Sequence, residues 1–169
     1  VSALEMAKGY ATIKNDGGYR NPTCIIKITD ADGQVLYQAD QTASVVYKEN
    51  ACRQMTDMLQ TVITSGTGRG YSLGNMPCAG KTGTTNDNKD GWFVGYTPYY
   101  TTSVWVGYDI PKEVPGLGGG TYPGKIWYAF MSWLHEGLEP IDFVHPLDQT
   151  LTDLGQTDTT ENALPETGE

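Results

Sequence analysis

Residues 78–108 read CAGKTGTTNDNKDGWFVGYTPYYTTSVWVGY, and this stretch decides the fold. It is rich in Thr, Val, Trp, Phe and Tyr, which favour extended backbone. Two turn-forming segments, NDNKDG at 86–91 and Thr97-Pro98, divide it into three short runs. Consecutive strands with short connections pair antiparallel, so the stretch predicts a three-stranded antiparallel meander.

Helical periodicity flanks the meander on both sides. Before it, a helix is expected between Asn50 and Gly66, where an apolar stripe comprises Met55, Met58, Leu59, Val62 and Ile63. After it, the glycine-rich loop Gly116–Gly120 leads to Pro123, a favourable first residue of a helix. One broad apolar face of that helix should cover the sheet, and its members are Ile126, Trp127, Phe130, Met131, Trp133 and Leu134.

The N-terminal segment predicts a helix followed by a β-hairpin. Ser2-Ala3-Leu4-Glu5 has the form of a capping box, and Asn15–Gly18 ends the helical pattern. Two β-type runs, at 23–29 and 34–38, are joined by Asp30–Gly33, whose Asp-Gly favours a tight turn. The fold class we predict is therefore α+β, an antiparallel sheet with helices packed on it.

Charge is distributed unevenly along the 169 residues, which have a net charge of −9. Residues 1–125 hold eleven basic and eleven acidic side chains, whereas residues 126–169 hold nine acids and no Lys or Arg. A neutral body with an acidic end offers no surface for phosphate backbones, which argues against a nucleic-acid partner. Residues 148–169 are too polar to repay the entropy of ordering, so we expect a disordered acidic tail.

The cysteines and histidines do not predict a metal site. Cys24, Cys52 and Cys78 are odd in number and lack C-x-x-C spacing, and the chain has two histidines. We expect the three cysteines to be small buried hydrophobic residues. No metal or organic cofactor is implied.

The segment that suggests a chemical function is Ala79-Gly80-Lys81-Thr82-Gly83-Thr84-Thr85. Gly80-Lys81-Thr82 matches the end of a phosphate-binding loop, G-x-x-x-x-G-K-[ST], but the first glycine of that motif would fall on Asn75. The residues after the motif also predict a strand and a turn, where a phosphate-binding loop must open a helix. The phosphate-binding hypothesis is therefore disfavoured.

The remaining hypothesis is the K-T-G element of serine acyl-transfer enzymes. Strand alternation places Lys81 and Gly83 on one face and Thr82 and Thr84 on the other, so one site can use all four residues only at a sheet edge. There the hydroxyls can donate to a terminal carboxylate, Lys81 can attract the same anion, and the Thr84 N–H suits an oxyanion. The structural alternative is an ordinary edge strand with a solvated lysine.

Three further segments surround this element: LEMAKGYAT at 4–12, TSGTG at 64–68 and NKDGWFVGYTP at 88–98. In this order, residues 1–145 resemble the transpeptidase domain of class A penicillin-binding proteins. The resemblance implies a peptidoglycan D,D-transpeptidase that acts on D-Ala-D-Ala stem peptides and binds β-lactams at the extracytoplasmic face of the bacterial membrane. It assigns Lys81, Thr82 and Gly83 to the K-T-G. It gives Thr84 the N–H that binds the oxyanion and a hydroxyl that binds the substrate carboxylate, and it gives Thr85 at most an indirect role.

The sequence departs from that family at the nucleophile. No serine begins an S-x-x-K or belongs to an S-x-N among Ser2, Ser44, Ser65, Ser72, Ser103 and Ser132. Tyr19-Arg20-Asn21 has the form of a Y-x-N motif, which we interpret as a coincidence. We expect residues 1–147 to be the C-terminal part of such a domain, inactive alone, with the N-terminal half as its partner upstream. Without that half, one edge of the meander and the side chains of Met55, Met58 and Leu59 should be exposed.

Two alternative functions stay open at this point. The missing nucleophile is also compatible with a non-catalytic module that senses peptides or β-lactams. Leu164-Pro165-Glu166-Thr167-Gly168 matches the L-P-x-T-G sorting signal of wall-anchored proteins. No apolar segment or basic end follows this match, so we favour coincidence or an appended tag.

Overall fold

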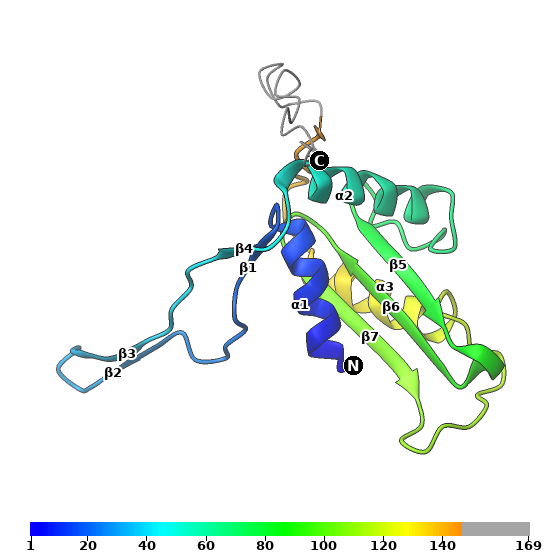
Figure 1. Cartoon of the computed structure of the whole chain (residues 1–169), viewed down its shortest axis with the longest axis horizontal. Coiled ribbons are helices and arrows are strands. Elements are labelled where there is room, and N and C mark those ends of the chain that lie inside the picture. Colours follow the sequence, from blue (N-terminus) through cyan, green and yellow to red (C-terminus); the bar gives the residue numbers. More distant parts are fainter. Residues whose placement is uncertain (147–169) are drawn as a thin grey trace, which may run out of the picture.

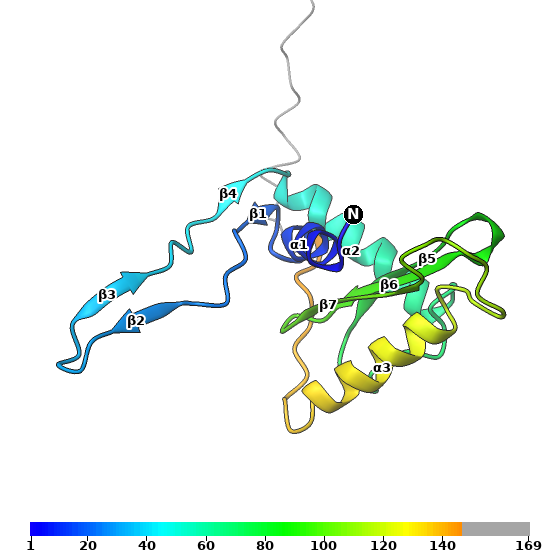
Figure 2. The ribbon, with the colours of Figure 1, turned by 90° about the horizontal axis from the view of Figure 1, so that it is seen from below.

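The computed structural model describes residues 1–146, and in that part of the chain the α+β fold is confirmed. Its central sheet has the strand order β5-β6-β7, formed by Ala79–Thr84, Asp90–Tyr96 and Thr101–Gly107. The predicted antiparallel meander is confirmed in all three strands. Helix α1 (Ala3–Lys14) lies on one face of this sheet and α3 (Tyr122–Leu134) on the other (Figure 2).

The predicted first helix begins at its capping box. The Ser2 hydroxyl accepts a hydrogen bond from the Glu5 amide at 3.2 Å, and the Ser2 amide donates to the Glu5 carboxylate at 2.8 Å. The hydrogen bonds that the Ser2 amide and the Ser2 hydroxyl donate to the Glu5 carboxylate lower the pKa of Glu5, because they favour its charged form. The helix ends where Asp16 and Gly17 adopt positive φ angles of 53° and 85°.

Helix α3 covers the sheet with a narrower stripe than the sequence pattern predicts. Trp127 and Met131 are completely buried, and the Trp127 ring lies 4.9 Å from that of Phe93. A side chain at Gly95 would come within 2.7 Å of the Trp127 ring, so glycine lets the indole lie directly on β6. The broad apolar face was wrong in three members, because a helix contacts a flat sheet along one stripe only; those exposed are Ile126, Phe130 and Trp133.

Helix α2 (Glu49–Thr64) confirms the predicted central helix and crosses the start of β5 (Figure 1). Its Leu59 is 7% exposed and packs with Ala79 and Tyr96, so the expectation that Leu59 would be exposed was wrong. Met55 and Met58 are exposed as expected, at 40% and 58%. Leu59 differs because it packs against the sheet, with Ala79 of β5 and Tyr96 of β6.

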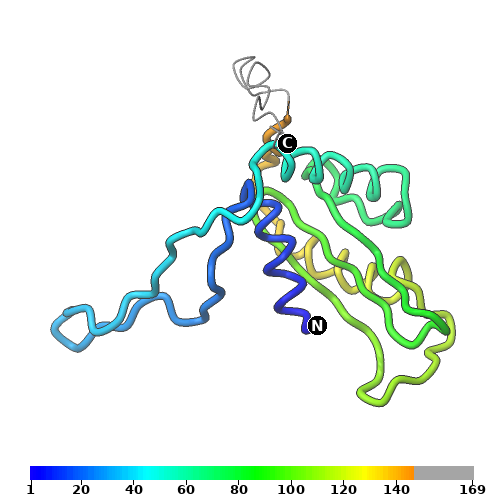
Figure 3. The backbone as a smooth tube through the Cα atoms, in the orientation of Figure 1, coloured from blue at the N-terminus to red at the C-terminus, as the bar shows by residue number. Residues whose placement is uncertain are grey.

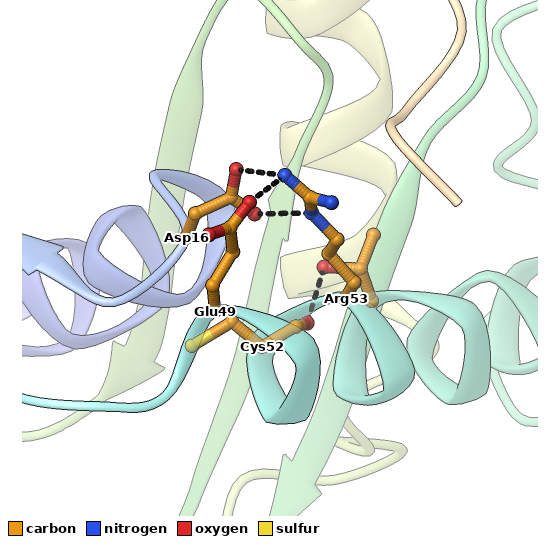
Figure 4. Close-up of polar contacts among 5 residues, drawn as sticks. Asp16, Glu49, Cys52 and Arg53 are labelled. Carbon is orange, nitrogen blue, oxygen red and sulfur yellow. Dashed lines mark hydrogen bonds and ion pairs between the residues drawn. The ribbon is translucent and has the colours of Figure 1, made fainter. Parts of the chain in front are cut away.

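An ion-pair cluster joins the end of α1 to the start of α2 (Figure 4). The Arg53 guanidinium makes two contacts with the Asp16 carboxylate, at 3.2 and 3.1 Å, and a further contact with Glu49. These carboxylates raise the pKa of Arg53, the hydrogen bond to Asp16 being the largest cause. The cluster holds the end of α1 against the start of α2, at the base of the segment that connects the two helices.

That segment is an arm that projects from the body (Figures 1 and 3). At its base β1 (Gly18–Tyr19) pairs with β4 (Ser44–Val45), and farther out β2 (Lys27–Thr29) pairs with β3 (Val35–Gln38). The predicted hairpin is confirmed, with strands shorter than the apolar runs. Asp30 builds its turn, because its carboxylate accepts hydrogen bonds from the amides of Asp32 and Gln34.

The cysteine prediction is confirmed for Cys52 and Cys78, which are buried, and wrong for Cys24, which is exposed. Cys24 lies on the arm, where the chain has no core to bury it in. Among residues 1–146 no helix combines the length and apolar character needed to cross a bilayer. The predicted acidic tail and the Leu164–Gly168 match lie outside the described residues.

Candidate active-site strand

The K-T-G sequence lies on β5, which is the edge strand of the central sheet as predicted. Within residues 1–146 no strand pairs with its outer side. The Thr85 amide donates to the Asp90 carbonyl at 3.0 Å, which fixes the alternation of the antiparallel ladder. In that alternation the backbone N–H and C=O groups of Thr84 and Thr82 point away from β6, toward the open edge.

Lys81 and Gly83 share the face that carries Trp92 and Val94, their partners on β6. Lys81 is exposed, and its ammonium donates to the Thr82 carbonyl at 2.7 Å. The cation therefore lies at the strand edge. This end of the face is uncovered in the described chain, since Trp105, which pairs with Trp92, is 40% exposed.

The opposite face, which carries Thr82 and Thr84, is covered by the glycine-rich loop. The Gly119 amide donates to the Thr84 hydroxyl at 2.9 Å. A side chain at Gly119 would come within 2.6 Å of three backbone atoms, the N and O of Gly83 and the O of Trp92. Glycine at 119 thus lets the loop lie directly against the K-T-G strand, a contact that sequence reasoning missed.

A second hydroxyl contact was also missed. The Thr67 hydroxyl lies 2.6 Å from that of Thr82, in the segment that follows α2. Thr67 belongs to the TSGTG segment, for which the family resemblance implied no role. Strand periodicity gives no signal for such a contact, because the two threonines are fifteen positions apart and only Thr82 lies on a strand.

In the part of the chain that it describes, the structure provides no accessible nucleophile paired with a base. The six serines are spread over the molecule, and among residues 1–146 none has a hydrogen bond to a lysine. His135 is buried and structural: its Nδ1 donates to the Met131 carbonyl, so its Nε2 accepts from the Thr97 hydroxyl, both at 2.7 Å. In this region no three His, Cys, Asp or Glu side chains gather as a metal site would require.

Comparison with known proteins identifies the family to which this chain belongs. The sequence profile of the penicillin-binding protein transpeptidase domain matches residues 1–132. The chain belongs to the penicillin-binding protein transpeptidase family. The resemblance to class A members is confirmed, because the matches to penicillin-binding protein 1A and PonA1 extend over most of the chain.

Two relatives, one of them in two structures, illustrate the match. Penicillin-binding protein 1A of Neisseria meningitidis is 40% identical over 145 residues, which are 81% of this chain and 18% of that protein. The structure of PonA1 from Mycobacterium tuberculosis superposes with a TM-score of 0.74 at 34% identity, covering 85% of this chain and 41% of that one. PonA1 in complex with penicillin V gives a TM-score of 0.72 at 32% identity, covering 84% and 40%. The chain thus spans less than half the length of each relative.

Proposed function

We propose that this chain is the K-T-G wall of a peptidoglycan D,D-transpeptidase whose nucleophilic serine lies outside residues 1–169. The observation that carries the proposal is β5 itself. Its open edge presents the backbone groups of Thr82 and Thr84, beside the Lys81 ammonium and two threonine hydroxyls. Membership of the transpeptidase family supports this interpretation of the edge.

The edge suits an extended peptide with a terminal carboxylate. A D-Ala-D-Ala stem peptide can add to β5 as a further strand, and Gly83 has no side chain to obstruct it. The hydroxyls of Thr82 and Thr84 then donate to the carboxylate, and the Lys81 ammonium attracts it. A β-lactam carries a carboxylate beside a strained carbonyl, and the complex of the related PonA1 with penicillin V supports binding of this ligand class.

The proposed reaction proceeds through an acyl-enzyme. A serine in the N-terminal half of the domain attacks the carbonyl of the penultimate D-Ala, and the Thr84 N–H stabilises the oxyanion. The bond to the terminal D-Ala breaks, and an amine of a second peptide then takes the acyl group and frees the serine. No step needs a metal or an organic cofactor. The reaction belongs at the extracytoplasmic face of the membrane, where peptidoglycan is assembled.

Of the two faces of β5, one is accessible to the N-terminal half in the described part of the chain. The glycine-rich loop occupies the face with Thr82 and Thr84. The other face is uncovered around Lys81, Trp92 and Trp105. We therefore place the serine and its base on the face of β5 that carries Lys81. There the Lys81 ammonium can lie close to the serine and its base at the strand edge.

The test is acylation of the complete parent protein by a fluorescent penicillin. Lys81→Ala should lower the second-order acylation rate constant at least about tenfold, which corresponds to about 1.4 kcal/mol of transition-state stabilisation. Lys27→Ala, which removes the same charge from the exposed arm, is the matched control and should leave the rate unchanged.

Equal rates for the Lys81→Ala protein and the control would contradict the assigned role of Lys81. A parent protein without S-x-x-K and without acylation would favour the sensing module instead.

A further inference from the structure

The TSGTG segment makes a side-chain hydrogen bond with the K-T-G strand through Thr67, and the proposed function gives Thr67 no role. Thr67 extends its hydroxyl to within 2.6 Å of the Thr82 hydroxyl. Both threonines border the open edge, Thr67 exposed and Thr82 half-buried. The contact therefore lies where a ligand carboxylate would approach.

The backbone around Thr67 is held from three directions. The amides of Gly66 and Gly68 donate to the carbonyls of Thr61 and Val62 at 3.0 Å, which ties the segment to the last turn of α2. Ile63 of the same turn packs against β5, since its terminal carbon would lie 3.3 Å from a side chain placed on Gly80. The position of Thr67 relative to the strand is thus fixed.

The glycine-rich loop closes the third side. A side chain at Gly120 would lie 2.8 Å from the Thr67 carbonyl oxygen, so the loop passes directly against this residue. The Tyr71 hydroxyl donates to the Gly120 carbonyl at 2.6 Å and fastens the loop there. The helix end, the strand and the loop therefore hold the backbone at Thr67 in place, with its hydroxyl beside that of Thr82.

Hydroxyl chemistry indicates what this contact does. A threonine hydroxyl has one proton to donate and can accept at the same time. Thr84 already accepts from a neighbour, the Gly119 amide, which leaves its own proton for a ligand. If Thr67 donates to Thr82, the Thr82 hydroxyl likewise keeps its own proton for a ligand. Thr82 and Thr84 then both present a proton toward the open edge.

We infer that Thr67 is a positioning residue of the carboxylate site: its hydroxyl donates to Thr82 and thereby directs the Thr82 proton to the carboxylate of a stem peptide or penicillin. This inference rests on the proposed function and names a further residue of the same site. Thr67 acts through Thr82 and need not touch the ligand.

The experiment measures acylation of the complete parent protein by a penicillin and by the methyl ester of the same penicillin, which lacks the anion. Thr67→Val should slow acylation by the acid about threefold to tenfold and should change acylation by the ester little. Thr67→Ser keeps the hydroxyl and should restore the rate with the acid. Thr64→Val is the matched control, because the Thr64 hydroxyl donates to the Thr61 carbonyl of its own helix and not to the K-T-G strand.

A double-mutant cycle tests the route through Thr82. Once Thr82→Val has removed the acceptor, Thr67→Val should cause no further loss. Additive losses, an unchanged rate in Thr67→Val, or an equal fall for acid and ester would each overturn the inference. Thermal unfolding identifies a misfolded Thr67→Val protein, and Thr67→Ala then takes its place in every comparison.

The two levels of the proposal fail differently. Absence of acylation in the unaltered parent would overturn the proposed function, and the inference with it, before any variant is compared. Acylation that depends on Lys81 but not on Thr67 would overturn the inference alone.

Discussion

Replacement of Gly119 by alanine tests how tightly the glycine-rich loop lies on the K-T-G strand. The added carbon would lie 2.6 Å from three backbone atoms, whereas ordinary contact begins at 3.4 Å, so the loop must retreat by about 0.8 Å. The hydrogen bond from the Gly119 amide to Thr84, now 2.9 Å, would then lengthen beyond bonding range. Overpacking of this kind costs about 1 to 3 kcal/mol, and the lost hydrogen bond about 1 kcal/mol more.

Thermal unfolding of the 169-residue chain measures this cost. Gly119→Ala should lower the melting temperature by roughly 5 to 15 °C, as expected for about 2 to 4 kcal/mol in a domain of this size. Gly118→Ala is the matched control, because its added carbon would meet its nearest neighbours, on Thr121 and Thr84, at 3.8 Å or more. Equal melting temperatures for the two variants would refute the close contact of loop and strand.

Three more predictions follow from burial and capping. Iodoacetamide should label Cys24 first, because Cys52 and Cys78 are buried and burial raises the pKa of both thiols; peptide mapping that finds Cys78 labelled first would contradict this. Burial raises the pKa of Tyr96 to about 12, so the neutral phenol stabilises the fold below about pH 10 and this contribution, up to about 3 kcal/mol, is lost as the pH rises to 12. In urea unfolding, the free energy of unfolding should fall less between pH 8 and pH 11 for Tyr96→Phe than for the unaltered protein. Ser2→Ala removes the cap of α1 and should cost about 1 kcal/mol in the same urea assay, while equal unfolding midpoints would count against the capping box.

The sequence was most informative where structure is local. The capping box of α1, the Asp30 turn and the three runs of the meander each depend on residues within a few positions of one another. Strand alternation also placed Lys81 and Thr82 on opposite faces, because the period of a strand does not depend on its surroundings.

Contacts between distant segments were not predictable in this way. The contacts of Gly119 with Thr84 and of Thr67 with Thr82 bring together residues 35 and 15 positions apart. Burial followed tertiary position rather than hydrophobicity, so Cys24 on the arm is exposed, while Leu59, which lies on the side of α2 that packs on the sheet, is buried. An amphipathic pattern states that a face is apolar, but not how much of it a neighbour covers.

The most direct test of the account locates the penicilloyl group. The complete parent protein and the 169-residue chain are each treated with a fluorescent penicillin, and the modified peptide is identified by mass spectrometry. The account predicts an adduct on a serine outside residues 1–169 in the parent protein and no adduct on the chain alone. An adduct on any of the chain's own six serines would contradict it.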